Sequence, residues 1–147
     1  MGIRRRAREC ALQLLYMWEF HRASGTFEPD LFWQDRDEDP AVREFAERIV
    51  NGVIARIAEV DQLIRTASLN WRIDRMATVD RNVLRLATYE LLDQKDTPVK
   101  VVLNEAIELS KRFGTEDSSS FVNGVLDKVA SLLKDRSGEP ASDGPRE

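Results

Sequence analysis

Apolar residues recur every three or four positions along most of the chain, which is the spacing of helices that bury one face. This pattern predicts a first helix over about 4–23, ended by Ser24-Gly25. A long helix is predicted over about 41–67, and a short turn or helix over 70–76. Gly52 inside the long helix weakens it by up to about 1 kcal/mol relative to alanine, so we expect another helix to approach closely there.

Capping residues predict two further helices in the second half of the chain. Thr78 is placed to cap a helix that ends near Gln94, with Asp80 in its first turn, where the helix dipole favours an acid. Thr97-Pro98 is typical of a new helix start, because a capping hydroxyl precedes a proline at the first helical position. That helix is expected to run to Phe113.

The same signals predict how the chain continues beyond that helix. Gly114 suits the left-handed position that follows a helix end, and Asp117 or Ser118 is placed to cap a last helix rich in valine and leucine. A short helix over 29–34 completes the set, and no segment alternates apolar and polar residues as a strand would. The pattern therefore predicts an all-α fold, a compact helical bundle.

Length and composition suit a single domain. A chain of 147 residues with 42% hydrophobic residues can bury a real core. We expect one domain over 1–135 and a disordered tail over 136–147, where the sequence is polar and contains proline and glycine. No apolar run approaches the roughly 20 residues of a membrane span. One cysteine, Cys10, and one histidine, His21, argue against a disulfide and a zinc site and favour the cytoplasm.

Catalytic motifs are missing from the sequence. It contains no glycine-rich phosphate loop, no metal-binding histidine cluster and no nucleophile motif. Carboxylate pairs such as Glu105 and Glu108 are typical of solvated helix faces. We therefore predict that the protein is not an enzyme and needs no cofactor or metal.

Positive charge is concentrated at the N-terminus, although the net charge is −4. Residues 1–8 contain four arginines and no acid, whereas 28–39 contain six acids and one arginine. Arginine suits phosphate because its planar guanidinium can donate two hydrogen bonds at once. This asymmetry favours a localised contact with nucleic acid over general coating. A solvated N-terminus is the alternative interpretation of the arginines.

A second group of candidate residues lies at the junction between the two C-terminal helices. The segment 104–127 combines cations, hydroxyls and Phe121 around Gly114. Backbone N–H groups at a helix start can bind a phosphate, and an aromatic ring stacked on a base contributes about 1–3 kcal/mol. Tyr16 is within reach of the same RNA strand. A half-buried core position is an equally good interpretation of Tyr16, and a phenylalanine in the first turn of a helix is more often a core residue. If the fold joins this junction to the N-terminal arginines, the chain has a site for single-stranded RNA.

Several segments occur in an order that is specific to one family. They are Arg4-Arg-Arg-Ala-Arg-Glu-Cys10, Asp80-Arg-Asn-Val-Leu-Arg-Leu-Ala87, Asn104-Glu-Ala-Ile-Glu-Leu109, Glu116-Asp117-Ser118 and Phe121-Val-Asn-Gly-Val-Leu-Asp127. In this order they resemble the NusB family of bacterial transcription antitermination factors, from Arg4 to about Val129. The resemblance implies seven helices in two packed subdomains.

The resemblance also implies a function, that of an adaptor. It implies binding of the boxA element in nascent RNA, a heterodimer with NusE, which doubles as a small-subunit ribosomal protein, and delivery to RNA polymerase. Asp74 and Asp80 correspond to the region that docks NusE. Pattern and resemblance together make these the candidate RNA-binding residues: Arg4, Arg5, Arg6, Arg8, Gln13, Tyr16, Lys111, Asp117, Ser118 and Phe121.

The arginine positions lead to a mutational expectation. Arg5 and Arg8, like Gln13 and Tyr16, lie largely off the apolar stripe of the first helix. Charge reversal at Arg5 and Arg8 is therefore expected to weaken RNA binding and to leave the fold intact.

One departure from the family and two alternatives bear on this interpretation. Ser119 and Ser120 stand where family members often carry a basic residue, and one lost phosphate contact would lower the salt slope of RNA binding by about 0.7. NusE is therefore expected to matter more for affinity. The alternatives are the RNA-binding domain of a ribosomal-RNA cytosine methyltransferase, and a helical protein-interaction scaffold or homodimer.

Overall fold

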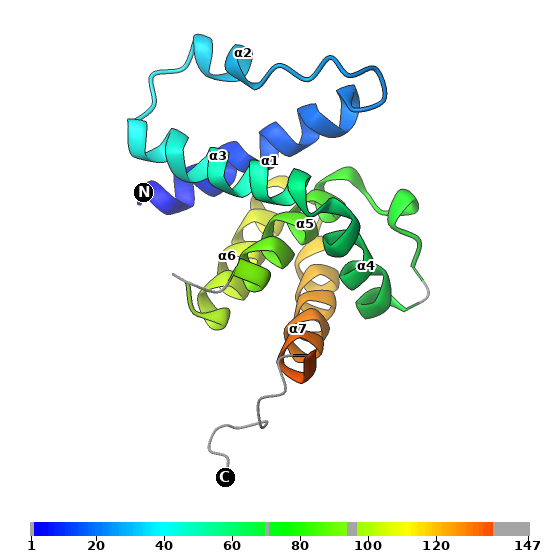
Figure 1. Cartoon of the computed structure of the whole chain (residues 1–147). Coiled ribbons are helices and arrows are strands. Elements are labelled where there is room, and N and C mark those ends of the chain that lie inside the picture. Colours follow the sequence, from blue (N-terminus) through cyan, green and yellow to red (C-terminus); the bar gives the residue numbers. More distant parts are fainter. Residues whose placement is uncertain (1, 70, 94–96, 137–147) are drawn as a thin grey trace.

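The computed structural model describes residues 2–69, 71–93 and 97–136, and within them every regular element is helical (Figure 1). A short 3₁₀ turn, Ile73–Arg75, lies between the fourth and fifth α-helices. The α-helices are α1 (Ile3–His21), α2 (Pro29–Gln34), α3 (Pro40–Ala55), α4 (Ile57–Ser68), α5 (Thr78–Asp93), α6 (Val99–Phe113) and α7 (Ser118–Arg136). The predicted all-α fold with seven helices is confirmed. None of these helices is both long and apolar enough to cross a membrane.

The helices form two groups that share α5. Helix α1 packs along α3, and α2 lies at the outer edge of this pair (Figure 1). Helices α4, α6 and α7 pack on α5, α7 also packs on α4 and α6, and α5 also contacts α1 and α3. Every residue of α5 from Arg81 to Thr88 is buried. The two packed subdomains implied by the family resemblance are therefore present, and α5 joins them.

The single long helix predicted over about 41–67 is wrong, because the chain bends at Arg56. The backbone of Arg56 has φ −117° and ψ 27°, so α3 ends at Ala55 and α4 begins at Ile57. Each helix buries its apolar face: Val53, before the bend, and Val60, after it, are both fully buried. The spacing of apolar residues indicates which residues face the core. It does not reveal a bend that leaves the same residues buried, so the pattern could not separate the two helices.

The close approach predicted at Gly52 is confirmed. A Cβ atom added there would lie 2.1 Å from Cζ of Tyr89, because the tyrosine ring on α5 lies directly over the glycine. Any larger side chain on α3 would therefore displace this ring. The glycine weakens α3 as a helix and lets α5 pack close to it.

Gly114 does not adopt the left-handed conformation that was predicted for it. Its φ is −101° and its ψ is −164°, which many residues adopt. The glycine is needed because an added Cβ would lie 2.4 Å from Oγ of Ser118 and 2.8 Å from the carbonyl oxygen of Ser110. A close approach therefore explains this glycine, and the backbone conformation does not.

Two predicted boundaries also shift. Thr78 is the first residue of α5 and not the residue before it, since the carbonyl of Ala77 accepts the first helical hydrogen bond, from Arg81. Helix α7 extends through Arg136, whose guanidinium lies 2.8 Å from the carboxylate of Glu59, so the predicted tail does not begin at 136. Residues 137–147, where the rest of that tail was predicted, lie outside the described residues.

A buried polar network ties the two subdomains together. Glu19 on α1 accepts hydrogen bonds from Arg81, Asn82 and Arg85, all on α5. Arg85 also forms a two-point ion pair with Asp61 on α4, at 2.9 and 3.1 Å. Burial raises the pKa of Glu19, but its hydrogen bond from Arg81 and the nearby guanidinium charges outweigh this and hold the pKa below the usual value.

Candidate nucleic-acid interface

The arginine-rich end of α1 lies close to α6, the helix that ends at the junction around Gly114. Arg5 on α1 forms a two-point ion pair with Glu105 on α6, with Nε–Oε1 at 3.1 Å and Nη2–Oε2 at 2.7 Å. One turn further along α1 and two turns further along α6, Arg112 of α6 lies 2.9 Å from the carboxylate of Glu9 on α1. The fold therefore brings together the N-terminal arginines and the segment that begins at Asn104. The sequence predicted a site for single-stranded RNA if these two regions lie together.

Arg8 is buried, and the prediction that it lies off the core stripe is wrong. Only 3% of the residue is exposed. Its guanidinium donates to both oxygens of Glu90 on α5, at 2.7 and 2.8 Å. Helix α5 crosses α1 here and covers a position that a single helix would leave open. Arg8 is therefore engaged inside the protein, and this geometry argues against a direct phosphate contact.

The other two arginines remain closer to the surface. Arg6 pairs with Glu38 and with Glu9, so the acidic loop reaches the arginine helix. The hydrogen bond from Arg6 holds the pKa of the Glu38 carboxyl below its usual range. Arg4 is exposed, and its guanidinium carbon lies 4.9 Å from the centre of the Phe45 ring. Of the four arginines, Arg4 is therefore the one that no described carboxylate holds.

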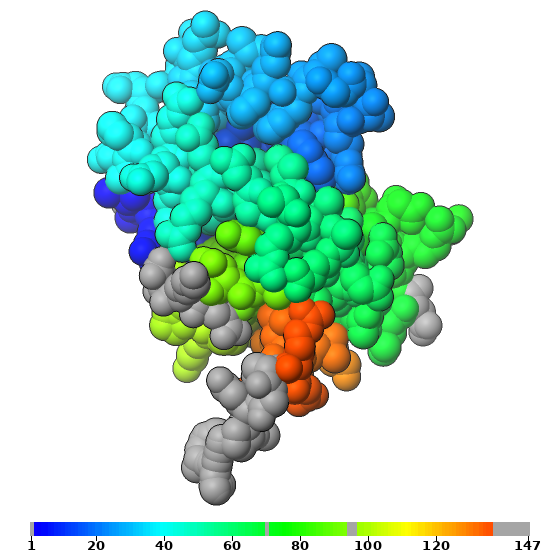
Figure 2. Space-filling view, viewed as in Figure 1, coloured from blue at the N-terminus to red at the C-terminus, as the bar shows by residue number. Residues whose placement is uncertain are grey.

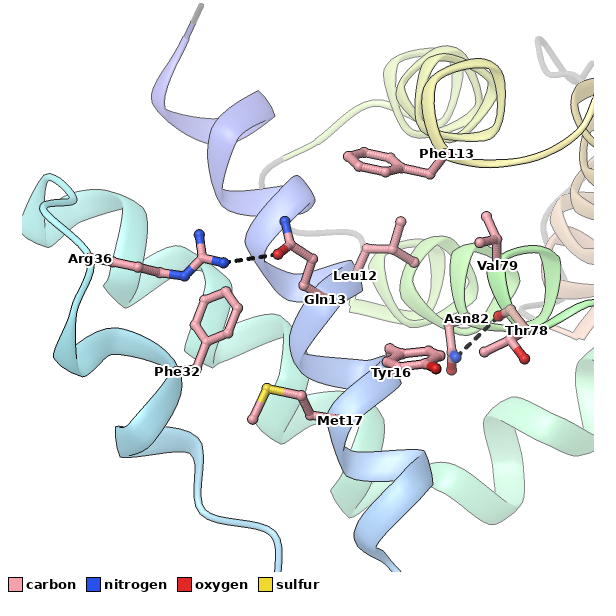
Figure 3. Close-up of a pocket in the computed structure, with 10 residues that line it drawn as sticks. All are labelled: Leu12, Gln13, Tyr16, Met17, Phe32, Arg36, Thr78, Val79, Asn82 and Phe113. Atoms are coloured by element: carbon pink, nitrogen blue, oxygen red, sulfur yellow. Dashed lines mark hydrogen bonds between the residues drawn. The ribbon is translucent and has the colours of Figure 1, made fainter.

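A groove between α1, the α2 region and the start of α5 contains two of the predicted residues (Figure 3). It has a volume of about 370 Å³, and Phe113 from the end of α6 points into it (Figure 3). Tyr16 is 56% exposed, so its ring is open to a ligand. The amide oxygen of Gln13 accepts a hydrogen bond from Arg36 at 3.0 Å, which leaves the amide N–H groups for another partner.

The start of α7 places its predicted residues differently. Ser118 is only 2% exposed, and its hydroxyl accepts the backbone N–H of Thr115 at 3.0 Å. This hydroxyl therefore closes the turn between α6 and α7, and its geometry argues against direct contact with RNA. Asp117 and Lys111 are exposed near the same turn.

Phe121 is half-buried and contacts an aromatic residue that the sequence interpretation missed. The ring centre of Phe121 lies 5.6 Å from that of Trp71, with the ring planes 69° apart. Tyr16 lines the groove beside α1, whereas Phe121 packs against Trp71, so the two predicted stacking residues have different neighbours. Trp71 stands between Asn70 and Arg72 in the sequence, and a tryptophan between two polar residues was the available signal.

The two candidate partner-binding acids have unequal exposure. Asp74 is exposed and forms an ion pair with Arg72 at 2.9 Å. Asp80 is partly buried, and its Oδ1 is enclosed without a hydrogen-bond partner among the described residues. Asp74 is therefore the more accessible of the two.

Sequence comparisons identify the relatives of this chain. The model of the NusB family matches residues 5–131. The transcription antitermination protein NusB of Sorangium cellulosum is 48% identical over 133 residues, which cover 90% of this chain and 95% of that protein. The protein of the same name in Anaeromyxobacter dehalogenans is 53% identical over 131 residues, covering 88% and 92%.

Solved structures of related proteins have the same fold. T. maritima NusB has a TM-score of 0.78 and 42% identity, over 87% of this chain and 90% of that one. A crystal structure of the antitermination factors NusB and NusE in complex with dsRNA contains a chain with a TM-score of 0.74 and 28% identity, over 90% and 98%. The family match spans most of the chain and the curated relatives are close to half identical, so this chain belongs to the NusB family.

Proposed function

We propose that this protein is a transcription antitermination factor that binds boxA single-stranded RNA together with NusE. The pair would couple this RNA to elongating RNA polymerase during transcription of ribosomal RNA, in the cytoplasm. The observation that carries the proposal is the contact of α1 with α6 through Arg5 and Glu105, which joins the arginine end to the C-terminal junction. Relatives that carry the antitermination name favour this function over a methyltransferase domain or a scaffold.

The arginines would serve the RNA backbone in different ways. Arg4 is open and would contact phosphate first. Arg5 and Arg6 are exposed or partly exposed and would exchange their carboxylate partners for phosphate. Lys111 would add a further cation at the end of α6. Arg8 would act as a positioning residue, because its ion pair with Glu90 fixes α1 against α5.

Aromatic and polar side chains would read the bases. Tyr16 offers an exposed ring and Phe121 a partly exposed one, and unpaired bases commonly stack on such rings. Gln13 would offer its amide N–H groups to a base edge. Asp117 would accept hydrogen bonds from base amino groups at the start of α7.

The partner surface would lie at the turn before α5 and in the first turn of that helix. Asp74 is exposed there, and Asp80 lies in the first turn of the helix. Acidic side chains suit a basic protein such as NusE. Two linked contacts, to RNA and to NusE, would raise the affinity of the whole assembly without any catalytic step.

The test is fluorescence anisotropy of a labelled boxA-type RNA beside a scrambled RNA of equal length. Each is titrated with the protein alone and then with NusE, at two salt concentrations. We expect preferential binding of the boxA-type RNA that weakens with salt and tightens with NusE. Binding to neither RNA, with or without NusE, would refute the proposal. Light scattering on the free protein then decides whether it is a monomer or a homodimer.

A further inference from the structure

Trp71 is the exposed tryptophan of this protein. It is 59% exposed, whereas Trp18 and Trp33 are 7% and 5% exposed and belong to the core. Large apolar rings that face solvent commonly mark a binding surface. Trp71 lies in the segment between α4 and α5, which projects from the body of the molecule and is coloured green at the right of Figures 1 and 2.

This tryptophan continues the aromatic surface that begins at Phe121. The two rings meet edge to face, with their centres 5.6 Å apart and their planes 69° apart. Such pairs are stable in themselves, so the Trp71 ring is held in place although much of it is open. Phe121 is one of the residues proposed to stack on RNA, and Trp71 is therefore adjacent to a proposed base site.

The surroundings of Trp71 favour a nucleic acid over a basic protein. An open hollow of about 540 Å³ borders the ring, and Arg65, Leu69 and Arg72 also line it. The exposed Arg65 at the end of α4 forms no ion pair with a described residue, and Arg72 pairs with Asp74. Asp74 also lines the hollow and offsets the charge of Arg72, so Arg65 is left as the uncompensated charge there and attracts phosphate.

We propose that Trp71 is a further base-stacking residue, which extends the RNA surface beyond Phe121 by one unpaired nucleotide. An aromatic face accepts any base, because every base has a π-surface. Arg65 lies beside the hollow and neutralises the phosphate of the same nucleotide. This inference rests on the proposed RNA-binding function and adds a residue to it.

Tryptophan fluorescence tests the proposal directly, because Trp18 and Trp33 are buried and Trp71 is not. The full-length protein is titrated with an unlabelled single-stranded boxA-type RNA while tryptophan emission is followed. We expect emission to fall as RNA binds, since a stacked base quenches the ring. The same titration of Trp71→Phe should leave emission unchanged, because the two remaining tryptophans stay in the core.

Two variants separate stacking from simple bulk. Trp71→Phe keeps an aromatic face and should bind labelled RNA within about twofold of the wild-type protein. Trp71→Leu keeps an apolar side chain without a π-surface and should bind about five- to a hundredfold more weakly. Both changes are at an exposed site, so circular dichroism should show the same helix content and a similar Tm. Arg65→Gln should weaken binding and lower the salt dependence.

The outcomes are distinguishable from those of the proposed function. RNA binding by the wild-type protein with unchanged emission, and with full affinity in Trp71→Leu, would overturn the Trp71 assignment and leave the RNA-binding function standing. Loss of NusE affinity in Trp71→Leu, with RNA binding intact, would assign the ring to protein docking and overturn the assignment too. Failure of the wild-type protein to bind RNA in the presence of NusE would overturn both.

Discussion

The guanidinium of Arg5 on α1 and the carboxylate of Glu105 on α6 form a two-point ion pair across the helix interface, at 3.1 and 2.7 Å. The hydrogen bond from Arg5 is the main cause that holds the pKa of Glu105 below its usual range, so the pair is fully charged at neutral pH. A phosphate that binds Arg5 must take the place of this carboxylate. Glu105 therefore competes with RNA for the same donor groups.

Glu105→Gln should tighten RNA binding, because it frees Arg5 and removes a negative charge from the site. An exposed pair is worth up to about 1 kcal/mol, so we expect about a two- to fivefold lower Kd in the anisotropy titration. Glu108→Gln is the matched control, since it removes the same charge from α6 and Glu108 is exposed and forms no ion pair within the described part of the chain. Equal effects of the two variants would mean that binding responds only to the loss of one negative charge. Weaker binding by Glu105→Gln would mean that Glu105 positions Arg5 for RNA.

Arg8→Met should destabilise the protein strongly, in contrast to Arg5→Met. The Arg8–Glu90 pair is buried, and removing one member of such a pair costs about 3–5 kcal/mol. Arg5 is about half exposed, and its loss should cost less than about 1 kcal/mol. Urea unfolding followed by circular dichroism measures both. Charge reversal at Arg8 is therefore expected to destabilise the fold, contrary to the expectation from the sequence. Equal urea midpoints for Arg8→Met and Arg5→Met would refute this prediction.

Two helical glycines should respond to alanine in opposite directions. Gly52→Ala gains up to about 1 kcal/mol in helix propensity, but its Cβ would overlap the Tyr89 ring, and overpacking costs about 1–3 kcal/mol. We expect net destabilisation and a lower Tm. Gly124 on α7 has no atom within 4 Å of an added Cβ, so Gly124→Ala should stabilise by about 0.5–1 kcal/mol. A higher Tm for Gly52→Ala would show that the tyrosine moves aside freely.

Glu19 should contribute to acid unfolding. Its pKa in the folded protein lies below the ordinary value of 4.5, so the folded state binds this proton less readily than the unfolded chain. The stability that Glu19 supplies is therefore complete above about pH 4.5 and is lost as the pH falls through the lower, folded pKa.

Glu19→Gln tests this contribution through urea unfolding at a series of pH values. The variant should be less stable at pH 7 by about 2 kcal/mol, because the arginines lose a charged acceptor. It should also lose less stability than the wild-type protein between pH 4.5 and pH 3. Parallel curves for the two proteins would exclude Glu19 as a source of the acid sensitivity. Glu116→Gln, at an exposed site in the turn before α7, serves as a control.

The sequence alone determined the helical class, most helix boundaries and the family. Each of these depends on neighbouring residues or on the order of motifs. Apolar spacing placed α1, α6 and α7, and Thr97-Pro98 marked a helix start within a few residues of the beginning of α6. The glycine at position 52 was correctly associated with a close approach, because only close packing compensates for its weak helix propensity.

Only the tertiary structure decided which polar residues are free. Arg5 and Arg8 are three positions apart on one helix, yet one is about half exposed and the other is buried against Glu90. The bend at Arg56 and the inward-pointing hydroxyl of Ser118 could not be predicted from the sequence either, because the apolar pattern is the same with or without them. Trp71 and Phe121 are 50 positions apart and meet only because α7 packs on α4 and α5, the helices on either side of Trp71. Local spacing encodes which face of a helix is apolar, whereas exposure and partners depend on the helices that cross it.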